Sequence, residues 1–227
     1  MKMNNGKMKG NISENLKQFK NGLPEDITLV AVSKTHPVGT IMEAYKAGQR
    51  IFGENKIQEM EAKWQEMPKD VEWHMIGHVQ RNKVKYMAPF VGLVHAVDSF
   101  RLLKEINKEA KKHSRTINCL LQIKIAEEES KFGMEIDKAG ELLNSEELKT
   151  LQNIKIMGLM GMATYTENEK QISEEFGRLK KYYDSLKDEH NLTVLSMGMS
   201  GDYKLAIAHG SNMIRVGSAI FGERDYA

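Results

Sequence analysis

The segment ITLVAVSKTHP, residues 27–37, places a lysine just after a short apolar run. Aliphatic and β-branched side chains fill residues 27–32, and such a run is typical of a buried strand. Lys34 then leaves the end of that strand. Ligands collect at this end of a closed parallel sheet, so the segment predicts an amine at the mouth of a site.

A second apolar run, far along the chain, is also followed by small and cationic residues. It lies in SNMIRVGSAIFGER, residues 211–224, and LSMGMSGD, residues 195–202, precedes it. Glycine lets backbone approach an anion closely, and N–H groups at a helix start are unpaired. Both loops therefore suit a phosphate, although each alone is a common turn sequence. The residues that we assign to this part of the site are Met199, Ser200, Arg215, Gly217 and Ser218.

Short apolar runs alternate with stretches of helical periodicity along the chain. The runs predict strands at residues 28–33, 50–53, 72–76, 93–97, 118–125, 155–162, 193–197 and 213–216. Such alternation predicts an α/β protein with parallel strands, here a single (β/α)8 TIM-type barrel domain over residues 1–227. An apolar stripe formed by Ile12, Leu16 and Phe19 predicts an extra N-terminal helix. An open doubly wound sheet would alternate too, but no GxGxxG follows the first strand.

Composition and charge exclude several classes of function. The chain has 227 residues, a net charge of +2 and 28% charged residues, so no global field draws it to nucleic acid or membrane. No stretch reaches the roughly 18 apolar residues of a membrane span, and residues 1–11 lack the apolar segment of a secretory signal. The one cysteine, Cys119, lies in an apolar run and is expected to be buried and inert. We therefore expect a cytoplasmic protein without nucleic-acid or membrane partners.

Other predicted strand ends bring further residues to the same rim. The second strand delivers residues 53–55 and the third delivers residues 74–78. The two histidines of 74–78 lie four apart, but Gly77 breaks the helical face that a metal-binding pair needs, so no metal site is expected. A lysine at a strand end is often only a surface charge. Beside a cation and phosphate-binding loops, however, Lys34 suits a ligand with an aldehyde and a phosphate, namely pyridoxal 5′-phosphate.

Seven motifs run in order between residues 29 and 224: LVAVSKTHP, IFGENKIQE, WHMIGHVQRNK, ESKFGM, GLMGMA, LSMGMSGD and GSNMIRVGSAIFGER. Together they closely resemble the pyridoxal phosphate homeostasis protein family, which is related in fold to the N-terminal barrel of alanine racemase. The match covers nearly the whole chain. One departure concerns the loop over the cofactor ring, where such proteins often have a proline and this chain reads MATYTENEK.

This resemblance implies a fold-type III pyridoxal phosphate barrel and a role for each matching residue. Lys34 would hold the cofactor as a Schiff base, and Asn55 would lie beside it. Arg215 matches the arginine that faces the pyridine nitrogen. The residues that match the family's phosphate contacts are Ser200, Gly217 and Ser218.

Arg215 also bears on the chemistry that such a site would support. A guanidinium stays protonated, so it hydrogen-bonds to an unprotonated ring nitrogen, which makes the cofactor a weaker electron sink. This argues against transamination. A racemase needs a second base, which alanine racemase takes from a separate C-terminal domain that we do not expect here, and Tyr165 is a poor substitute in a surface loop.

The leading hypothesis is a non-catalytic, monomeric carrier that holds pyridoxal phosphate and hands it to pyridoxal-phosphate-dependent apoenzymes. A low-activity amino-acid racemase is the alternative. A lysine aldolase that uses Lys34 on a sugar phosphate is a third hypothesis, which the resemblance disfavours.

Overall fold

A computed structural model of the chain describes residues 11–128 and 132–222. Within these residues the strands form a closed parallel barrel in chain order, from β1 to β8, and β8 pairs with β1. The predicted (β/α)8 barrel is therefore confirmed. The strands are β1 (Thr28–Val32), β2 (Ile51–Glu54), β3 (Glu72–Met75), β4 (Leu93–Val97), β5 (Ile117–Ile123), β6 (Ile154–Gly161), β7 (Val194–Ser196) and β8 (Met213–Val216).

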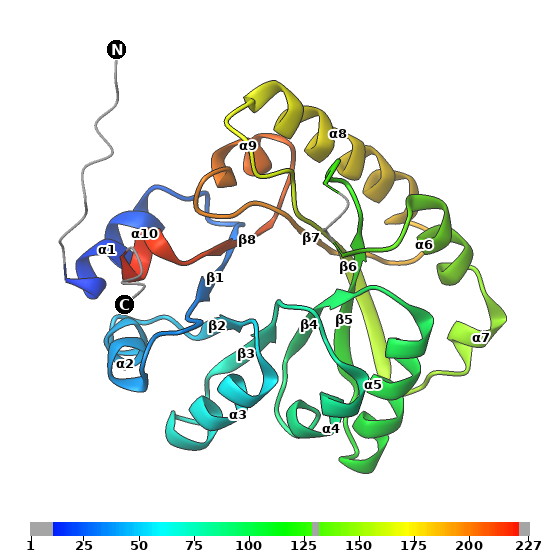
Figure 1. Ribbon diagram of the computed structural model, residues 1–227, viewed down its shortest axis with the longest axis horizontal. Coiled ribbons are helices and arrows are strands. Elements are labelled where there is room, and N and C mark those ends of the chain that lie inside the picture. Colours follow the sequence, from blue (N-terminus) through cyan, green and yellow to red (C-terminus); the bar gives the residue numbers. More distant parts are fainter. Residues whose placement is uncertain (1–10, 129–131, 223–227) are drawn as a thin grey trace.

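Helices surround the barrel and connect its strands (Figure 1). They are α1 (Ile12–Asn21), α2 (Val38–Lys46), α3 (Ile57–Glu66), α4 (Val84–Met87), α5 (Phe100–Lys112), α6 (Ile136–Leu143), α7 (Glu146–Lys149), α8 (Glu169–Leu186), α9 (Tyr203–Ala208) and α10 (Ser218–Phe221), with a 3-10 turn η1 (Arg81–Lys83). The expected extra helix before the first strand is α1. It lies against α10, and the Asn15 side chain donates a hydrogen bond to the Ile220 carbonyl at 3.2 Å.

The apolar core has two layers because the strands of a barrel alternate between an inner and an outer face. The larger layer lies between the sheet and the helices and includes Phe52, Trp73 and Phe176. The smaller layer, which includes Val30 and Leu120, fills the barrel interior. Side chains thus close the barrel below its rim and leave the strand ends to form a site.

Three sequence expectations concern single residues or segments. Cys119 is buried as expected, and burial raises the pKa of its thiol. No helix in the described part of the chain is long and apolar enough to cross a bilayer. Three parts of the segments discussed above lie outside the described residues: residues 1–10, residues 129–131 of ESKFGM, and residues 223–224 of the last motif.

Candidate functional site

A pocket of about 330 Å³ opens at the C-terminal ends of the barrel strands. Its lining comes mainly from residues just past these ends, where the loops of a parallel barrel meet. This volume falls in the usual range of small-molecule sites. All seven residues predicted for the site line this pocket: Lys34, Asn55, Met199, Ser200, Arg215, Gly217 and Ser218. The structure therefore brings them together, while their role in binding stays a prediction.

Lys34 is half-buried, and the residues on both sides of it are held in place. The buried hydroxyl of Ser33 donates to Glu54 Oε1 at 2.6 Å. On the other side, the Thr35 N–H donates to Glu59 Oε1 at 2.5 Å. Thr35 has a φ of 69°, which β-branched residues rarely adopt, so the surrounding contacts must maintain this turn. The backbone that carries Lys34 is thereby fixed.

A buried ammonium group joins these supports. Lys63 Nζ on α3 lies 2.7 Å from Glu54 Oε1 and 2.7 Å from Glu59 Oε1, and it donates to the Ser33 carbonyl at 2.8 Å. Burial raises the pKa of the Glu54 carboxyl, and Lys63 opposes that shift. The cluster thus ties β2 and α3 to the end of β1, directly before Lys34.

The loops after β7 and β8 are linked to each other. The Gly217 N–H donates to Ser200 Oγ at 3.3 Å, which connects the two loops across the pocket wall. Asp202 directly precedes α9, and its carboxylate accepts from the Met199 N–H at 2.5 Å. Ser218 is exposed at the start of α10. These loops therefore form one wall of the pocket. The residues that they contribute to its lining are Met199, Ser200, Gly217 and Ser218, and none of these four is acidic.

Arg215 enters the pocket from inside the barrel. Its side chain on β8 is buried, with 3% exposure. The guanidinium donates to the Ser196 carbonyl at 3.0 Å, to Ser196 Oγ at 2.6 Å and to the Gly161 carbonyl at 3.0 Å. Burial lowers the pKa of Arg215 to about 10, so the group stays protonated at neutral pH. A fixed cation therefore forms the floor of the pocket.

The prediction that His74 lies at the rim is wrong. His74 points into the barrel below the pocket, with 1% exposure, because its strand alternates faces. Its Nδ1 lies 3.0 Å from His95 Nε2, and its Nε2 lies 3.0 Å from Glu72 Oε1. His78, the other histidine of that motif, does line the pocket, and its Nδ1 lies 3.2 Å from Asp98 Oδ2.

Gln122 and Phe132 line the pocket but were not predicted as site residues. Gln122 on β5 is buried, and its Nε2 donates to the Phe132 carbonyl at 2.7 Å. The sequence held a signal for Gln122, since a lone amide within an apolar strand needs a buried partner. Phe132 belongs to the ESKFGM motif, which is the signal the sequence held for it, and its ring is 53% exposed.

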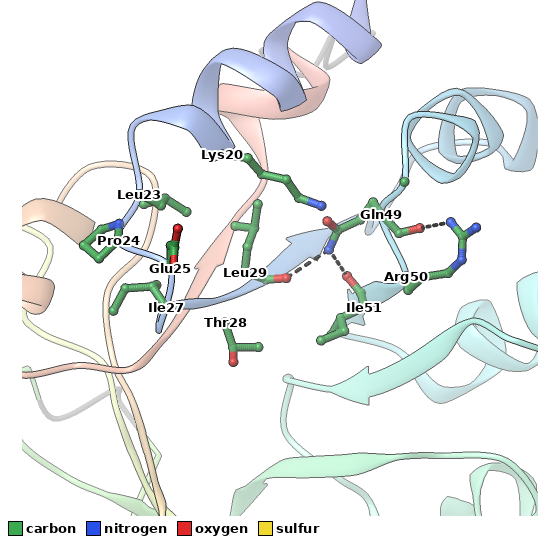
Figure 2. A pocket seen from close by; sticks show the side chains of 11 residues that line it. Lys20, Leu23, Pro24, Glu25, Ile27, Thr28, Leu29, Gln49, Arg50 and Ile51 are labelled. Atoms are coloured by element: carbon green, nitrogen blue, oxygen red, sulfur yellow. Dashed lines mark hydrogen bonds between the residues drawn. The ribbon is translucent and has the colours of Figure 1, made fainter.

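A second cavity, of about 430 Å³, lies at the opposite end of the barrel, between the end of α1 and the starts of β1 and β2 (Figure 2). Lys20 and Arg50 reach it, and the buried Gln49 amide donates to the Leu29 and Ile51 carbonyls. None of the predicted site residues lines this cavity. The rim pocket is therefore the candidate functional site.

Known proteins resemble this chain over most of its length. A family model described as the alanine racemase N-terminal domain matches residues 9–225. The pyridoxal phosphate homeostasis protein of Aquifex aeolicus is 39% identical over 201 residues, which cover 87% of this chain and 87% of that protein. Among solved structures, PipY of Synechococcus elongatus with pyridoxal phosphate bound is 35% identical, with a TM-score of 0.84 and coverage of 93% of this chain and 100% of PipY.

A more distant structure, the alanine racemase of Clostridium difficile, shares the fold at 19% identity and a TM-score of 0.78, with coverage of 95% of this chain and 57% of the racemase. The family model spans the described barrel from α1 to α10. This chain belongs to the pyridoxal phosphate homeostasis protein family, built on the alanine racemase N-terminal domain.

Proposed function

We propose that this protein holds pyridoxal phosphate in the rim pocket, as a Schiff base with Lys34, and passes it to other proteins as part of pyridoxal phosphate homeostasis. The observation that carries the proposal is that a single pocket gathers an amine, a buried guanidinium and two loops of small residues. The bound cofactor in PipY, at 35% identity, supports it.

The residues of the pocket fit the three parts of this cofactor. Ser200 and Ser218 offer hydroxyl donors to a phosphate, from loops that the hydrogen bond between the Gly217 N–H and Ser200 Oγ already joins. Gly217 has no side chain, so the backbone there can come close to an anion. Three hydrogen bonds occupy Arg215, which has five N–H groups, so donors are left for a ring nitrogen. Asn55 lines the same pocket and would lie beside the ring.

When bound, pyridoxal phosphate supplies an aldehyde that condenses reversibly with a primary amine. Lys34 provides the amine, and its fixed backbone keeps Nζ within reach of the pocket. Arg215 places a permanent positive charge on the floor of the same pocket. Transfer would require an amine of the acceptor to take the place of Lys34 as the partner of that aldehyde.

The acceptors in this proposal are pyridoxal-phosphate-dependent apoenzymes. We further propose that residues 1–227 act as a single barrel domain, as a monomer and in the cytoplasm, without a catalytic turnover of its own. Against racemization, Tyr165 is 92% exposed and does not line the pocket, so no tyrosine stands opposite Lys34 in the described part of the site.

Two measurements on one preparation test the proposal. Pyridoxal phosphate is titrated into the protein and followed by absorbance, and the loaded protein is then mixed with an apoenzyme whose activity reports transfer. We expect saturable binding and transfer; failure to bind would refute the proposal. Cα–H exchange of amino acids in D₂O, at rates typical of enzymes, would instead establish the racemase.

A further inference from the structure

The motif IFGENKIQE, residues 51–59, contributes Asn55 to the lining of the rim pocket. Its last residue, Glu59, has a different neighbour. Glu59 lies in the first turn of α3, and its Oε1 accepts from the Thr35 N–H at 2.5 Å. Thr35 directly follows Lys34, so the motif that borders the pocket also holds the backbone next to the lysine.

The turn at Thr35 is one that its own side chain opposes. Thr35 has a φ of 69°, and in this left-handed region the Cβ of an L-residue crowds the backbone. Such a conformation persists only where the surroundings impose it. The Thr35 hydroxyl donates to the Lys34 carbonyl at 2.5 Å, and the His36 N–H donates to the Ser33 carbonyl at 3.1 Å. These two bonds stay within the segment, whereas the bond to Glu59 ties the turn to another element, α3.

Lys63 keeps Glu59 charged and in place. Its ammonium group, on the same helix, lies 2.7 Å from Glu59 Oε1 and 2.7 Å from Glu54 Oε1, and its side chain is buried. Burial opposes the ionisation of Glu59, but the hydrogen bonds from Lys63 and from the Thr35 N–H lower the pKa of its carboxyl. The Thr35 N–H therefore donates to a carboxylate, and such a bond is stronger than one to a neutral acceptor.

The direction of the Lys34 side chain depends on this turn. Side chains alternate along extended backbone, so Ser33 points to Glu54 while Lys34 points to the pocket. Thr35 then turns the chain toward α2. Because Ser33 is held on one side and α2 packs against the core on the other, a change of φ at Thr35 has to be taken up by the backbone of Lys34.

We propose that Glu59 is a positioning residue for Lys34: together with Lys63, it holds Thr35 in the left-handed turn that directs the amine into the rim pocket. The effect on cofactor linkage rests on the proposed function, whereas the restraint on the turn is a property of the protein alone. Ser200 and Arg215 stand after β7 and on β8, so their contacts with a ligand should not depend on Glu59.

Loss of Glu59 should therefore affect the covalent step and spare the non-covalent contacts. In the covalent step the neutral amine condenses with the aldehyde: a C=N bond replaces the C=O bond and one water leaves, without an oxidant or another reactant. Pyridoxine 5′-phosphate carries an alcohol in place of the aldehyde and cannot condense with an amine. Its affinity thus measures the non-covalent contacts alone.

The first test measures hydrogen exchange at the Thr35 amide by NMR, in protein without cofactor. We expect Glu59→Ala to speed this exchange about tenfold or more, because the N–H loses a charged acceptor. Glu66→Ala removes an exposed carboxylate from the end of the same helix and should keep the wild-type rate. An unchanged rate in Glu59→Ala would overturn the proposed restraint, whether or not pyridoxal phosphate binds.

The second test compares two affinities in the same variants. Calorimetry measures pyridoxine 5′-phosphate binding, and borohydride reduction across a titration with pyridoxal phosphate measures linkage to Lys34. In Glu59→Ala we expect half-maximal linkage to need about tenfold more pyridoxal phosphate, while pyridoxine 5′-phosphate binds as in the wild type and in Glu66→Ala. Equal weakening of both, or of neither, would overturn the positioning role.

A glycine at position 35 tests whether the turn itself carries the effect. Glycine adopts a positive φ readily, so adding Thr35→Gly to Glu59→Ala should recover part of the lost linkage. Linkage that stays as low as in Glu59→Ala would show that the turn is not what Glu59 maintains. If the wild type itself links no pyridoxal phosphate, the proposed function is refuted instead, and the exchange measurement alone decides the restraint.

Discussion

At the scale of single residues, the site depends on how Lys34 and Arg215 are held. Lys34 sits between Ser33 and Thr35, each of which is bonded to a glutamate. Arg215 is anchored through Ser196 and Gly161. In both cases neighbouring groups fix the charged side chain or its backbone before a ligand arrives, so little ordering is left to binding.

The phosphate contacts can be tested without disturbing the amine. We expect Ser200→Ala combined with Ser218→Ala to weaken pyridoxal phosphate binding by about tenfold or more, because hydroxyl donors to an anion are lost. At saturating cofactor the protein should still link it through Lys34. Titration by absorbance measures both quantities, and Ser173→Ala on α8 is the control. Full affinity in the double variant would place the phosphate elsewhere.

Sequence reasoning found the residues near strand ends, Arg215 among them, and missed the paired polar residues His95 and Ser196 inside the barrel. Lys34, Ser200 and Arg215 stand in loops or at strand ends that the apolar runs locate. His95 and Ser196 lie within short strands, where a polar residue is easily read as an interruption of the core. Their partners come from strands distant in the sequence, so no local pattern shows that they are paired.

At the scale of elements, the predicted and observed strands agree closely. Residues 93–97 and 213–216 match β4 and β8 at both ends. The largest difference is at β5, predicted to end at residue 125 and observed to end at Ile123. There Lys124 turns away to pair its backbone with Met134, a contact with a later segment that periodicity cannot show.

The ion pair that joins α3 to β2 gives an element-scale prediction. We expect Lys63→Met to destabilise the protein by about 3–5 kcal/mol, because it leaves the Glu54 carboxylate buried without its partner. Denaturant unfolding measures the change. The same substitution at Lys149, which pairs with Glu146 on the surface of α7, should have little effect. Equal effects of the two substitutions on the free energy of unfolding would show that the buried Lys63–Glu54 pair does not stabilise the packing of α3 on β2.

At the scale of the whole molecule, the closed barrel brings residues from both ends of the chain into one pocket. β1 pairs with β8, so Lys34 and Gly217 leave neighbouring strands although they are far apart in sequence. The predicted barrel implied this proximity because it closes in order. The hydrogen-bonded His74 and His95 in its interior did not follow from the fold class, since other barrels fill that space with apolar layers.

The buried His95 makes global stability depend on pH. Its pKa is lowered on folding, so below about pH 6.5 the unfolded chain binds a proton that folded His95 does not. The free energy of unfolding is therefore unaffected by this group above that pH. Below it, the free energy of unfolding falls as the pH falls, by up to about 1.4 kcal/mol per pH unit. Urea unfolding at pH 7.5, 6.5 and 5.5 should show a smaller slope in His95→Gln. His113→Gln, which removes an exposed histidine at the end of α5, should keep the wild-type slope, and equal slopes in all three proteins would contradict this account.

The most direct test of the central claim is to identify the lysine that binds the cofactor. The protein is loaded with pyridoxal phosphate, reduced with borohydride, digested and analysed by mass spectrometry, with Lys34→Ala and the exposed Lys181→Ala treated alike. We expect the reduced adduct on the peptide that contains Lys34 in the wild type and in Lys181→Ala, and no adduct in Lys34→Ala. An adduct at another lysine, or none in the wild type, would contradict the account.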